Sequence, residues 1–322
     1  MCVILYTEID GKKILAKNRD RPYKPDMEII HEIVNGIELA YIRDKISGWI
    51  EGMNDQHIGI VNSTLGRSKT HLKPLKPLKP LKKKKKYSTS NKNNVIYTAL
   101  TTKNINNKNF YDIIKKTDKN YILEGNTLLL YKDDVFHIEN TDDNMFVTNK
   151  IKNTTVFSNH GTIIKKRGYT KCKKGLSSFL RRKIIQSELK NNNISTIDDL
   201  VNIMNRNYTN LDPRLHPYRD KATTLKRVKD IDPDETLINT TGQLILNMTD
   251  NIFIYYTDTN NTKKITYVNK LPHDYIPKIQ IIIKESEKNL KPRKIFTKKK
   301  LQKIYKRFDC KTKKNKKMIN HK

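Results

Sequence analysis

An Asp-Gly pair at positions 10 and 11 is the feature that most constrains the fold of this chain. It lies between Val3–Ile9, which is rich in β-branched and aromatic residues, and the extended segment Lys12–Lys17. Asp-Gly favours a tight two-residue turn, so the two segments are predicted to form a β-hairpin. Pairing outward from the turn sets Cys2 opposite Arg19, and a one-residue bulge would instead set Asp20 there.

Cys2 is a candidate nucleophile because it follows the initiator methionine. Removal of Met1 would leave a thiol and a free α-amine on one residue. The amine titrates near about 7.7 to 8.0, so at neutral pH a fraction of it can accept the thiol proton. The hairpin brings the cations of Lys17 and Arg19 beside the sulfur, where positive charge favours the thiolate. The Asp20 carboxylate can hold the amine. The alternative is a solvated strand end with ordinary surface charges.

These residues resemble a known family. Cys2, a short hairpin and the Asn18-x-Asp20 pair resemble the N-terminal nucleophile (Ntn) hydrolases, specifically the choloylglycine hydrolase and penicillin acylase type that cleaves linear amides. Asn18-Arg19-Asp20 is also similar to the Asn-Arg-Asp-Glu (NRDE) family of the transport and Golgi organisation type. Lys17 stands where the hydrolases usually have arginine, and Arg21 stands where the NRDE family has glutamate. Lysine lacks the planar fork of arginine, so Arg19 is expected to take its place.

The resemblance continues along the chain. The segments 48–54 and 57–62 are similar to the hydrolase pattern Gly-Met-Asn-x-x-Gly-Leu, and Asn159 follows a predicted strand at Thr154–Phe157. Asn159 matches the family asparagine that donates to the oxyanion, as a tetrahedral intermediate requires. Ser177 and Ser178 are similar to a serine-capped helix start whose arginine faces the site. The resemblance thus implies two sets of residues, catalytic Cys2, Asp20, Asn159 and Arg181, and substrate-binding Lys17, Asn18, Arg19, Arg182 (second choice to Arg181) and Asn62.

The net charge of +32 is concentrated in two segments. Residues 67–94 hold Arg67 and ten lysines without an acid, and residues 288–322 hold sixteen Lys or Arg against Asp309. Prolines at every third position in the first segment exclude regular helix and indicate an extended loop within one domain, residues 1–287. In the second segment, Leu301, Ile304, Tyr305 and Phe308 have helical spacing, which predicts a short basic amphipathic helix in an otherwise disordered tail.

Such segments bind nucleic acid or anionic surfaces without much discrimination. A non-enzymatic nucleic-acid or virion-associated protein is therefore one alternative to a small-molecule amide hydrolase, and an NRDE-type protein that handles a small molecule is another. Abundant Lys, Asn, Ile and Tyr also fit compositional drift in an AT-rich genome, such as that of a large DNA virus or a parasite.

Three scattered cysteines, no signal peptide and no transmembrane run predict a reducing compartment, the cytoplasm, or the virion if the protein is viral. The basic tail is also compatible with the nucleus. No Gly-rich phosphate loop, His-Glu-x-x-His or Cys-x-x-Cys motif occurs, so neither a metal nor a nucleotide cofactor is expected. His57, His160 and His216 could each serve a cysteine, but a lone histidine is more often structural.

The remaining pattern predicts an α+β fold. Asn35-Gly36 indicates a second hairpin, and strands are predicted at 58–62, 95–100, 121–131, 135–138, 235–240, 244–248, 252–256 and 264–268. Helices are predicted at 110–116, 178–190 and 196–205, the last with a capping signature at Ser195-Thr196. The Ntn resemblance implies a four-layer αββα sandwich of two antiparallel sheets.

Overall fold

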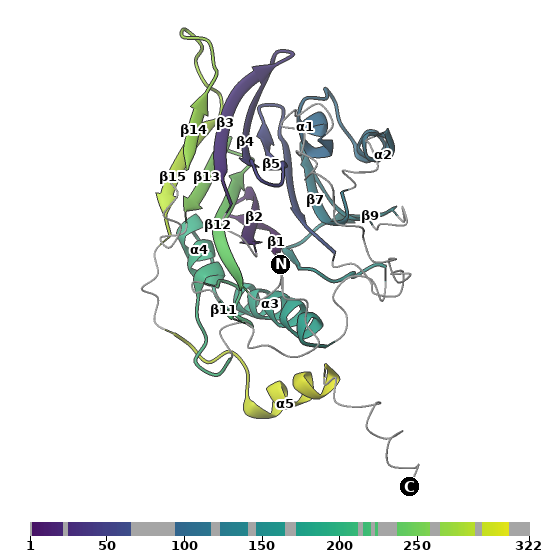
Figure 1. Cartoon of the computed structure of the whole chain (residues 1–322), viewed down its shortest axis with the longest axis vertical. Helices are drawn as coiled ribbons and strands as arrows, with labels where there is room; N and C mark the ends of the chain where they lie inside the picture. Colours follow the sequence, from purple (N-terminus) through teal and green to yellow (C-terminus); the bar gives the residue numbers. More distant parts are fainter. Residues whose placement is uncertain are drawn as a thin grey trace, which may run out of the picture.

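The computed structural model contains two β-sheets stacked face to face, with helices on both outer faces (Figure 1). The structure describes residues 2–21, 25–65, 94–116, 123–140, 146–164, 172–211, 215–219, 223–224, 237–257, 265–286 and 292–308. The predicted basic loop at 67–94 lies outside the described residues except for Asn94. Of the basic tail, the structure describes residues 292–308.

The first sheet carries the N-terminal hairpin. Its strands pair in the order β10-β1-β2-β12-β13-β15, with β11 against β12. Their bounds are β1 (Val3–Ile9), β2 (Lys12–Arg21), β10 (Thr155–Phe157), β11 (Thr223–Thr224), β12 (Leu237–Asn247), β13 (Ile252–Thr257) and β15 (Gln280–Glu285). The register of β1 and β2 is the predicted one, with Val3 facing Asn18 and no bulge between them. Asp10 and Gly11 both have positive φ, 50° and 72°, as the two-residue turn requires.

The second sheet has the order β14-β3-β4-β5-β6-β7-β8-β9. Its strands are β3 (Met27–Val34), β4 (Ile37–Asp44), β5 (Trp49–Asn54), β6 (Ile58–Ser63), β7 (Gly125–Tyr131), β8 (Asp134–Asn140), β9 (Phe146–Ile151) and β14 (Thr266–Asn269). The sheets are mixed rather than purely antiparallel, because β13 with β15 and β3 with β14 are parallel pairs. Between β13 and β15 the chain crosses to the other sheet as β14, and it therefore returns to β13 in the same direction.

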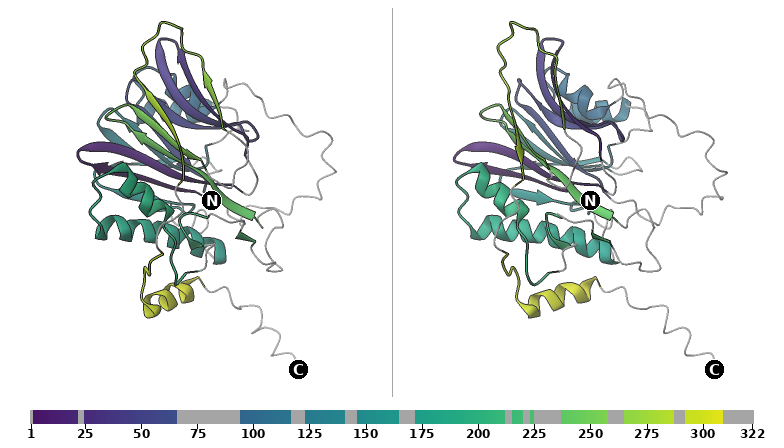
Figure 2. Two further views of the ribbon diagram at one scale, coloured as in Figure 1. Left: turned by 90° about the vertical axis from the view of Figure 1, so that its left-hand side faces the viewer. Right: turned by 60° about the vertical axis from the view of Figure 1, so that its left-hand side comes forward.

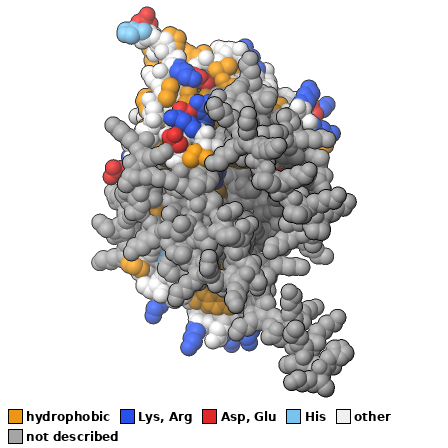
Figure 3. All heavy atoms as spheres, in the orientation of Figure 1, with side chains coloured by type: hydrophobic (Ala, Val, Ile, Leu, Met, Phe, Trp, Pro, Cys, Tyr) orange, Lys and Arg blue, Asp and Glu red, His pale blue; other side chains and the backbone are white. Residues whose placement is uncertain are grey.

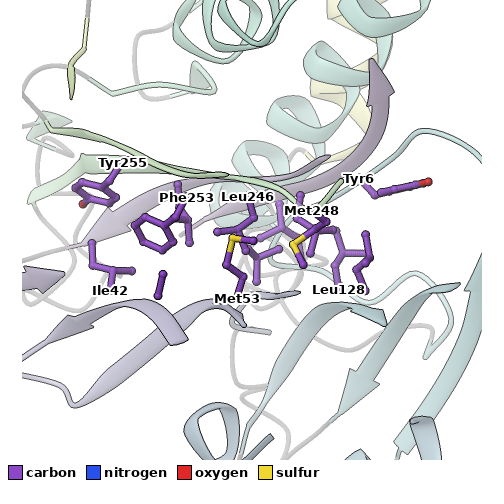
Figure 4. Close-up of a cluster of buried hydrophobic side chains, with 14 of the residues drawn as sticks. Tyr6, Ile42, Met53, Leu128, Leu246, Met248, Phe253 and Tyr255 are labelled. Atoms are coloured by element: carbon purple, nitrogen blue, oxygen red, sulfur yellow. The ribbon is translucent and has the colours of Figure 1, made fainter. Parts of the chain in front are cut away.

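Three apolar clusters hold the layers together and confirm the predicted α+β, αββα arrangement. The first fills the space between the sheets and includes Leu15, Met53 and Phe253 (Figure 4). The second packs the outer face of the second sheet against α1 (Val95–Leu100) and α2 (Asn107–Lys116). The third packs the first sheet against α3 (Cys172–Asn191) and α4 (Ile197–Asn205). Figure 2 shows the two helix pairs on opposite sides of the stacked sheets.

The strand predicted at Val95–Leu100 is wrong, because this segment is helix α1. Asn94 caps the helix, and its side-chain oxygen accepts hydrogen bonds from the backbone N–H groups of Ile96 and Tyr97 at 3.0 and 3.1 Å. The β-branched residues suggested a strand, but the cap and the burial of one helical face outweigh that local preference.

Two predicted element boundaries also change. Helix α3 begins at Cys172, so Ser177 and Ser178 lie inside it and do not cap its start. The two strands predicted at 235–240 and 244–248 form the single strand β12, whose register against β2 shifts between Thr240 and Gln243. A bulge of this kind lets one long strand follow the twist of its neighbour without a turn.

Within the basic tail, helix α5 covers Lys298–Arg307 and lies beneath α3 (Figure 2). Leu301 and Phe296 belong to an apolar cluster that includes Leu180 and Ile184 of α3, so this part of the tail packs on the fold. No helix in the described ranges is both long and apolar enough to cross a membrane.

Candidate active site

Strand β2 distributes its polar residues to two different layers. Side chains alternate across a strand, and Leu15 lies between the sheets, whereas Ala16 lies against α3 and α4. Lys17 and Arg19 therefore point into the space between the sheets. Asn18 and Asp20 point toward the helices. Residues 17–20 look like one motif in the sequence, but they make two separate sets of contacts, one on each face of β2.

Cys2 lies directly before β1, and only 3% of its surface is exposed. Its thiol lies 3.9 Å from the backbone carbonyl oxygen of Asp20, and Nη1 of Arg21 donates to the sulfur at 3.7 Å. The carbonyl oxygen of Cys2 accepts hydrogen bonds from Oγ of Ser63 at 3.2 Å and of Ser158 at 3.1 Å. The nucleophile candidate is thus held by the ends of β2 and β6 and by the residue that follows β10.

The charges around Cys2 favour its thiolate. Burial alone would raise the pKa of the Cys2 thiol, but the positive charges of Lys17, of the amino terminus carried by Met1 and of Arg21 outweigh burial and lower the pKa from 9.0 to about 7. Asp20 opposes this effect. At neutral pH a thiol with this pKa is about half ionised. The Cys2 thiol is therefore partly ionised at neutral pH, and no histidine among the described residues is hydrogen-bonded to it.

A buried ion network joins the two sheets beside the thiol. Glu51 on β5 accepts from Lys17 Nζ through Oε1 and from Arg19 Nη1 through Oε2, the latter at 2.9 Å. Asp44 on β4 lies 3.8 Å from Arg19 Nη2 and 3.7 Å from Arg21 Nε. Burial lowers the pKa of Lys17, and Glu51 opposes that shift. For Glu51 burial would raise the pKa, but Lys17 and Arg19 outweigh it and lower the pKa.

On the opposite face of β2, Arg181 connects Asp20 to Asn159. Arg181 is fully buried on α3. Its Nη1 donates to Oδ2 of Asp20 at 2.9 Å, and its Nη2 donates to Oδ1 of Asn159 at 3.0 Å and Oγ of Ser158 at 3.3 Å. The other carboxylate oxygen of Asp20 accepts from Oγ of Thr240 at 2.8 Å. The Asp20 carboxylate therefore contacts Arg181 and Thr240, and it is the backbone carbonyl of Asp20 that faces the thiol.

Arg181 also sets the orientation of the Asn159 amide. A guanidinium can only donate, so the oxygen of Asn159 must face Arg181 and the Nδ2 group must face the end of β6. Nδ2 donates to Oγ of Ser63 at 3.2 Å and to the carbonyl oxygen of Thr64 at 2.6 Å. Because Ser63 also donates to the carbonyl of Cys2, the amide donor lies two hydrogen bonds from that carbonyl.

Three of the predicted substrate-binding side chains are not brought to the thiol. Asn18 Nδ2 donates to the carbonyl oxygens of Met204 and Pro217, both at 3.0 Å, so it ties β2 to α4. Asn62 shares the face of β6 that carries Ile60, which is covered by α1 and α2, and its Nδ2 donates to Oγ1 of Thr127. Because side chains alternate along β6, the adjacent Ser63 faces the site instead of Asn62.

The third such side chain, Arg182, belongs to a neighbouring cluster. Its guanidinium lies 5.5 Å from the ring centre of Phe157, and Nη1 lies 3.5 Å from Nε2 of His160. Nδ1 of His160 in turn pairs with Oγ of Ser178 at 2.8 Å, and Ser178 accepts from the backbone N–H of Asn159. This cluster supports the chain around Asn159.

The other candidate histidines have structural partners. His57 Nδ1 bonds the carbonyl of Met248 at 3.0 Å, and the two ring nitrogens of His216 lie near Asn207 and Tyr208. Within the described ranges, no group of three or more His, Cys, Asp or Glu side chains is arranged to hold a metal ion.

Sequence reasoning did not single out Glu51, Asp44, Ser63 or Ser158, and it treated Arg21 only as a departure from a family pattern. A signal for Glu51 was present in the sequence. It lies two residues before Met53, within the segment 48–54 that resembles the hydrolase pattern, so alternation along a strand puts Glu51 on the same face as Met53, which lies between the sheets.

Neither a family model nor a curated protein sequence matches the chain. Among solved structures, a mutant and a variant of the conjugated bile acid hydrolase from Clostridium perfringens are 12% and 13% identical. Each aligns over 85% of this chain and 100% of its own, with TM-scores of 0.42 and 0.43. Penicillin V acylase from Agrobacterium tumefaciens is 10% identical over 92% of this chain and 99% of its own, with a TM-score of 0.44. TM-scores below 0.5 carry no argument for function. None of these matches corresponds to the NRDE resemblance.

Proposed function

We propose that the protein is an amidohydrolase that uses Cys2 as an N-terminal nucleophile after removal of Met1, and that it cleaves the C–N bond of a linear small-molecule amide. The observation that carries the proposal is the environment of the Cys2 sulfur. A buried thiol whose pKa is lowered to about 7 by neighbouring cations is chemically suited to attack a carbonyl.

In the first step the thiolate attacks the amide carbonyl, a C–S bond forms, and the carbonyl oxygen takes up the negative charge. Asn159 Nδ2 is the side-chain donor proposed for that oxygen, and it would exchange its bond to Ser63 or Thr64 for one to the oxyanion. The C–N bond then breaks, and the leaving amine takes a proton from the α-ammonium of Cys2. Water attacks the thioester, releases the carboxylic acid and restores the thiol.

Lys17, Arg19 and Arg21 supply the positive charge on the side of the site between the sheets. Arg21 donates to the sulfur itself, and Lys17 lowers the thiol pKa more than the other charges do. Asp20 and Arg181 act by positioning, since Arg181 fixes the orientation of Asn159 and the Asp20 backbone carbonyl faces the thiol. No step in this scheme requires a metal or an organic cofactor.

Intact mass spectrometry and turnover test the proposal together. The mature chain should lack Met1, and Cys2 should be acylated on brief exposure to substrate. A panel of N-acyl amino acids, penicillin V and bile-salt-like amides covers the substrate class. Cys2→Ala should lose at least about a hundredfold in rate, since removing a nucleophile leaves only the weaker contributions to catalysis. Cys310→Ser, which removes another thiol, should keep the parent rate. Retention of Met1 in active protein, or full activity of Cys2→Ala, would refute the assignment.

Nucleic-acid binding through the basic tail is a second candidate function. On α5, Lys299, Lys303 and Lys306 are exposed, while Leu301 packs inward. Figure 3 shows blue Lys and Arg side chains along the lower edge of the molecule. Changing these three lysines to glutamine should weaken binding of a single-stranded oligonucleotide and reduce its salt dependence. Unchanged binding would exclude this helix.

A further inference from the structure

At the end of the molecule remote from Cys2, five chain segments surround a hollow of about 720 Å³. Lys13 comes from the start of β2, His57 from the turn between β5 and β6, Lys103 from the segment after α1, and Lys132 from the turn between β7 and β8. Met248, from the turn after β12, lies at the base. From Lys13 to Arg21, which touches the thiol, β2 spans about 26 Å. The hollow is therefore separate from the candidate active site, and Figure 2 shows the N-terminus and the turn of the first hairpin at opposite ends of the purple strands.

The hollow is strongly basic. Among the described residues that line it, the one carboxylate is Asp133, which is ion-paired with Lys13 and whose side chain is 93% exposed. Within the described ranges neither Lys103 nor Lys132 forms an ion pair, and the Lys132 ammonium lies 5.3 Å from the ring centre of Tyr131. Two lysines without an ion-pair partner, from different segments, therefore line one concavity. Each carries three N–H donors and no acceptor, which suits a ligand with several anionic oxygens.

His57 adds a second kind of ligand group. Its Nδ1 lies 3.0 Å from the carbonyl oxygen of Met248, and a carbonyl only accepts, so Nδ1 carries a proton. Nε2 has no hydrogen-bond partner among the described residues. It can accept a hydrogen bond from a protonated phosphate oxygen.

The segments around the hollow are joined by backbone hydrogen bonds. The backbone N–H of Lys132 donates to the carbonyl of His57 at 3.0 Å, and the N–H of Met248 donates to the carbonyl of Lys13 at 2.9 Å. His57 and Lys132 have φ of 58° and 53°, in the left-handed region, which is uncommon for residues other than glycine, asparagine, aspartate and histidine. A rigid concave site loses little conformational entropy on binding.

We propose that this hollow binds a small phosphate-bearing molecule, with Lys103, Lys132 and His57 contacting the phosphate. A phosphomonoester carries nearly two negative charges at pH 7 and offers three acceptor oxygens. The volume lies within the range of small-ligand pockets, about 300 to 1,000 Å³. A single strand of nucleic acid would favour a basic groove that follows its backbone, whereas here the lysines line a single hollow.

The test uses the full-length protein, with adenosine 5′-monophosphate and pyrophosphate as probes, in calorimetric titrations at about 0.15 M salt. The double variant Lys103→Gln/Lys132→Asn removes both free charges, and asparagine tolerates the positive φ at position 132. The matched control is Lys270→Gln/Lys284→Gln, which changes the net charge equally at two half-exposed lysines that do not line the hollow. Thermal unfolding verifies that both variants are folded.

The first double variant should bind the probes at least tenfold more weakly than the parent protein, and the control variant should bind them with the parent affinity. His57→Gln should weaken binding severalfold. Equal losses in both double variants would mean that binding follows net charge and would overturn the proposal. The proposal would also be overturned if the parent protein bound neither probe measurably. It would likewise fail if the Lys103→Gln/Lys132→Asn variant lost affinity for a single-stranded oligonucleotide but for neither probe.

Discussion

Replacing Lys17 by methionine is predicted to raise the pKa of the Cys2 thiol. Lys17 is the largest of the charges that lower this pKa from 9.0 to about 7, a difference worth roughly 3 kcal/mol in favour of the thiolate. Burial opposes those charges and remains after the substitution. Methionine preserves the volume of the buried side chain and removes only the charge. We therefore expect the thiol pKa to rise by at least about one unit in Lys17→Met.

The size of this effect on reactivity follows from two opposing factors. For a rise of about one unit, the thiolate fraction at pH 7 falls from about one half to about one in ten. A thiolate of higher pKa is also more nucleophilic, by roughly threefold per pKa unit at a Brønsted slope near 0.4 to 0.5. The alkylation rate at pH 7 should thus fall only about twofold, while the midpoint of the rate–pH curve should move by at least about one unit. The midpoint is the more sensitive measurement.

The assay is the pH dependence of iodoacetamide alkylation, read at the Cys2 peptide by mass spectrometry so that Cys172 and Cys310 do not contribute. Lys17→Arg retains the charge and should keep the midpoint near 7. Lys12→Met, at the other end of β2, removes a lysine that is 46% exposed and ion-paired to Asp250, and should also leave the midpoint unchanged. A shift below about 0.5 units in folded Lys17→Met would refute the electrostatic reasoning.

The substitution should also cost stability, but less than the loss of an isolated buried partner. Glu51 loses Lys17 yet keeps Arg19 Nη1 at 2.9 Å and the backbone N–H of Asn62 at 3.0 Å. Removing one member of a buried pair costs about 3 to 5 kcal/mol when the other charge is left alone. With these partners remaining, a loss of about 1 to 3 kcal/mol in urea unfolding is expected.

Three further predictions concern stability. Asp20→Asn leaves the buried Arg181 guanidinium without its carboxylate, and should cost about 3 to 5 kcal/mol in denaturant unfolding, whereas Asp250→Asn at the surface should change little. Asn94→Ala removes the cap of α1 and should cost about 1 kcal/mol, and a loss below about 0.3 kcal/mol would contradict the cap assignment. Burial, with Arg182 and Arg181, lowers the pKa of His160 from 6.5 to about 4, so its neutral form stabilises the fold fully above pH 6.5, and this stabilisation is lost as the pH falls toward 4. His160→Gln should flatten the pH dependence of unfolding in that window, and an unchanged slope would argue against a buried neutral imidazole.

The part of the site that the N-terminal hairpin forms was predictable because its residues are close together in the sequence. The turn at Asp10-Gly11 sets the register of the hairpin, and the register delivers Lys17 to Asp20 beside the segment that begins with Cys2. The prediction of a strand at Val95–Leu100 was wrong because it relied on local residue preference alone. The β-branched residues favour a strand, but the Asn94 cap and an apolar face packed on a sheet that is distant in the sequence stabilise a helix.

The sequence by itself determined which residues could meet within a few strand positions of the turn, since a two-residue turn and side-chain alternation leave few choices. Only the tertiary structure decided what those residues do once they are buried. Lys17 faces Glu51 from the other sheet, and Asp20 binds Arg181 from a helix 161 positions away. In the folded structure the Asn62 side chain donates to Thr127, and Arg21 contacts the sulfur. A buried charge is stable only beside a partner, and that partner is chosen by the packing of layers rather than by neighbours in the chain.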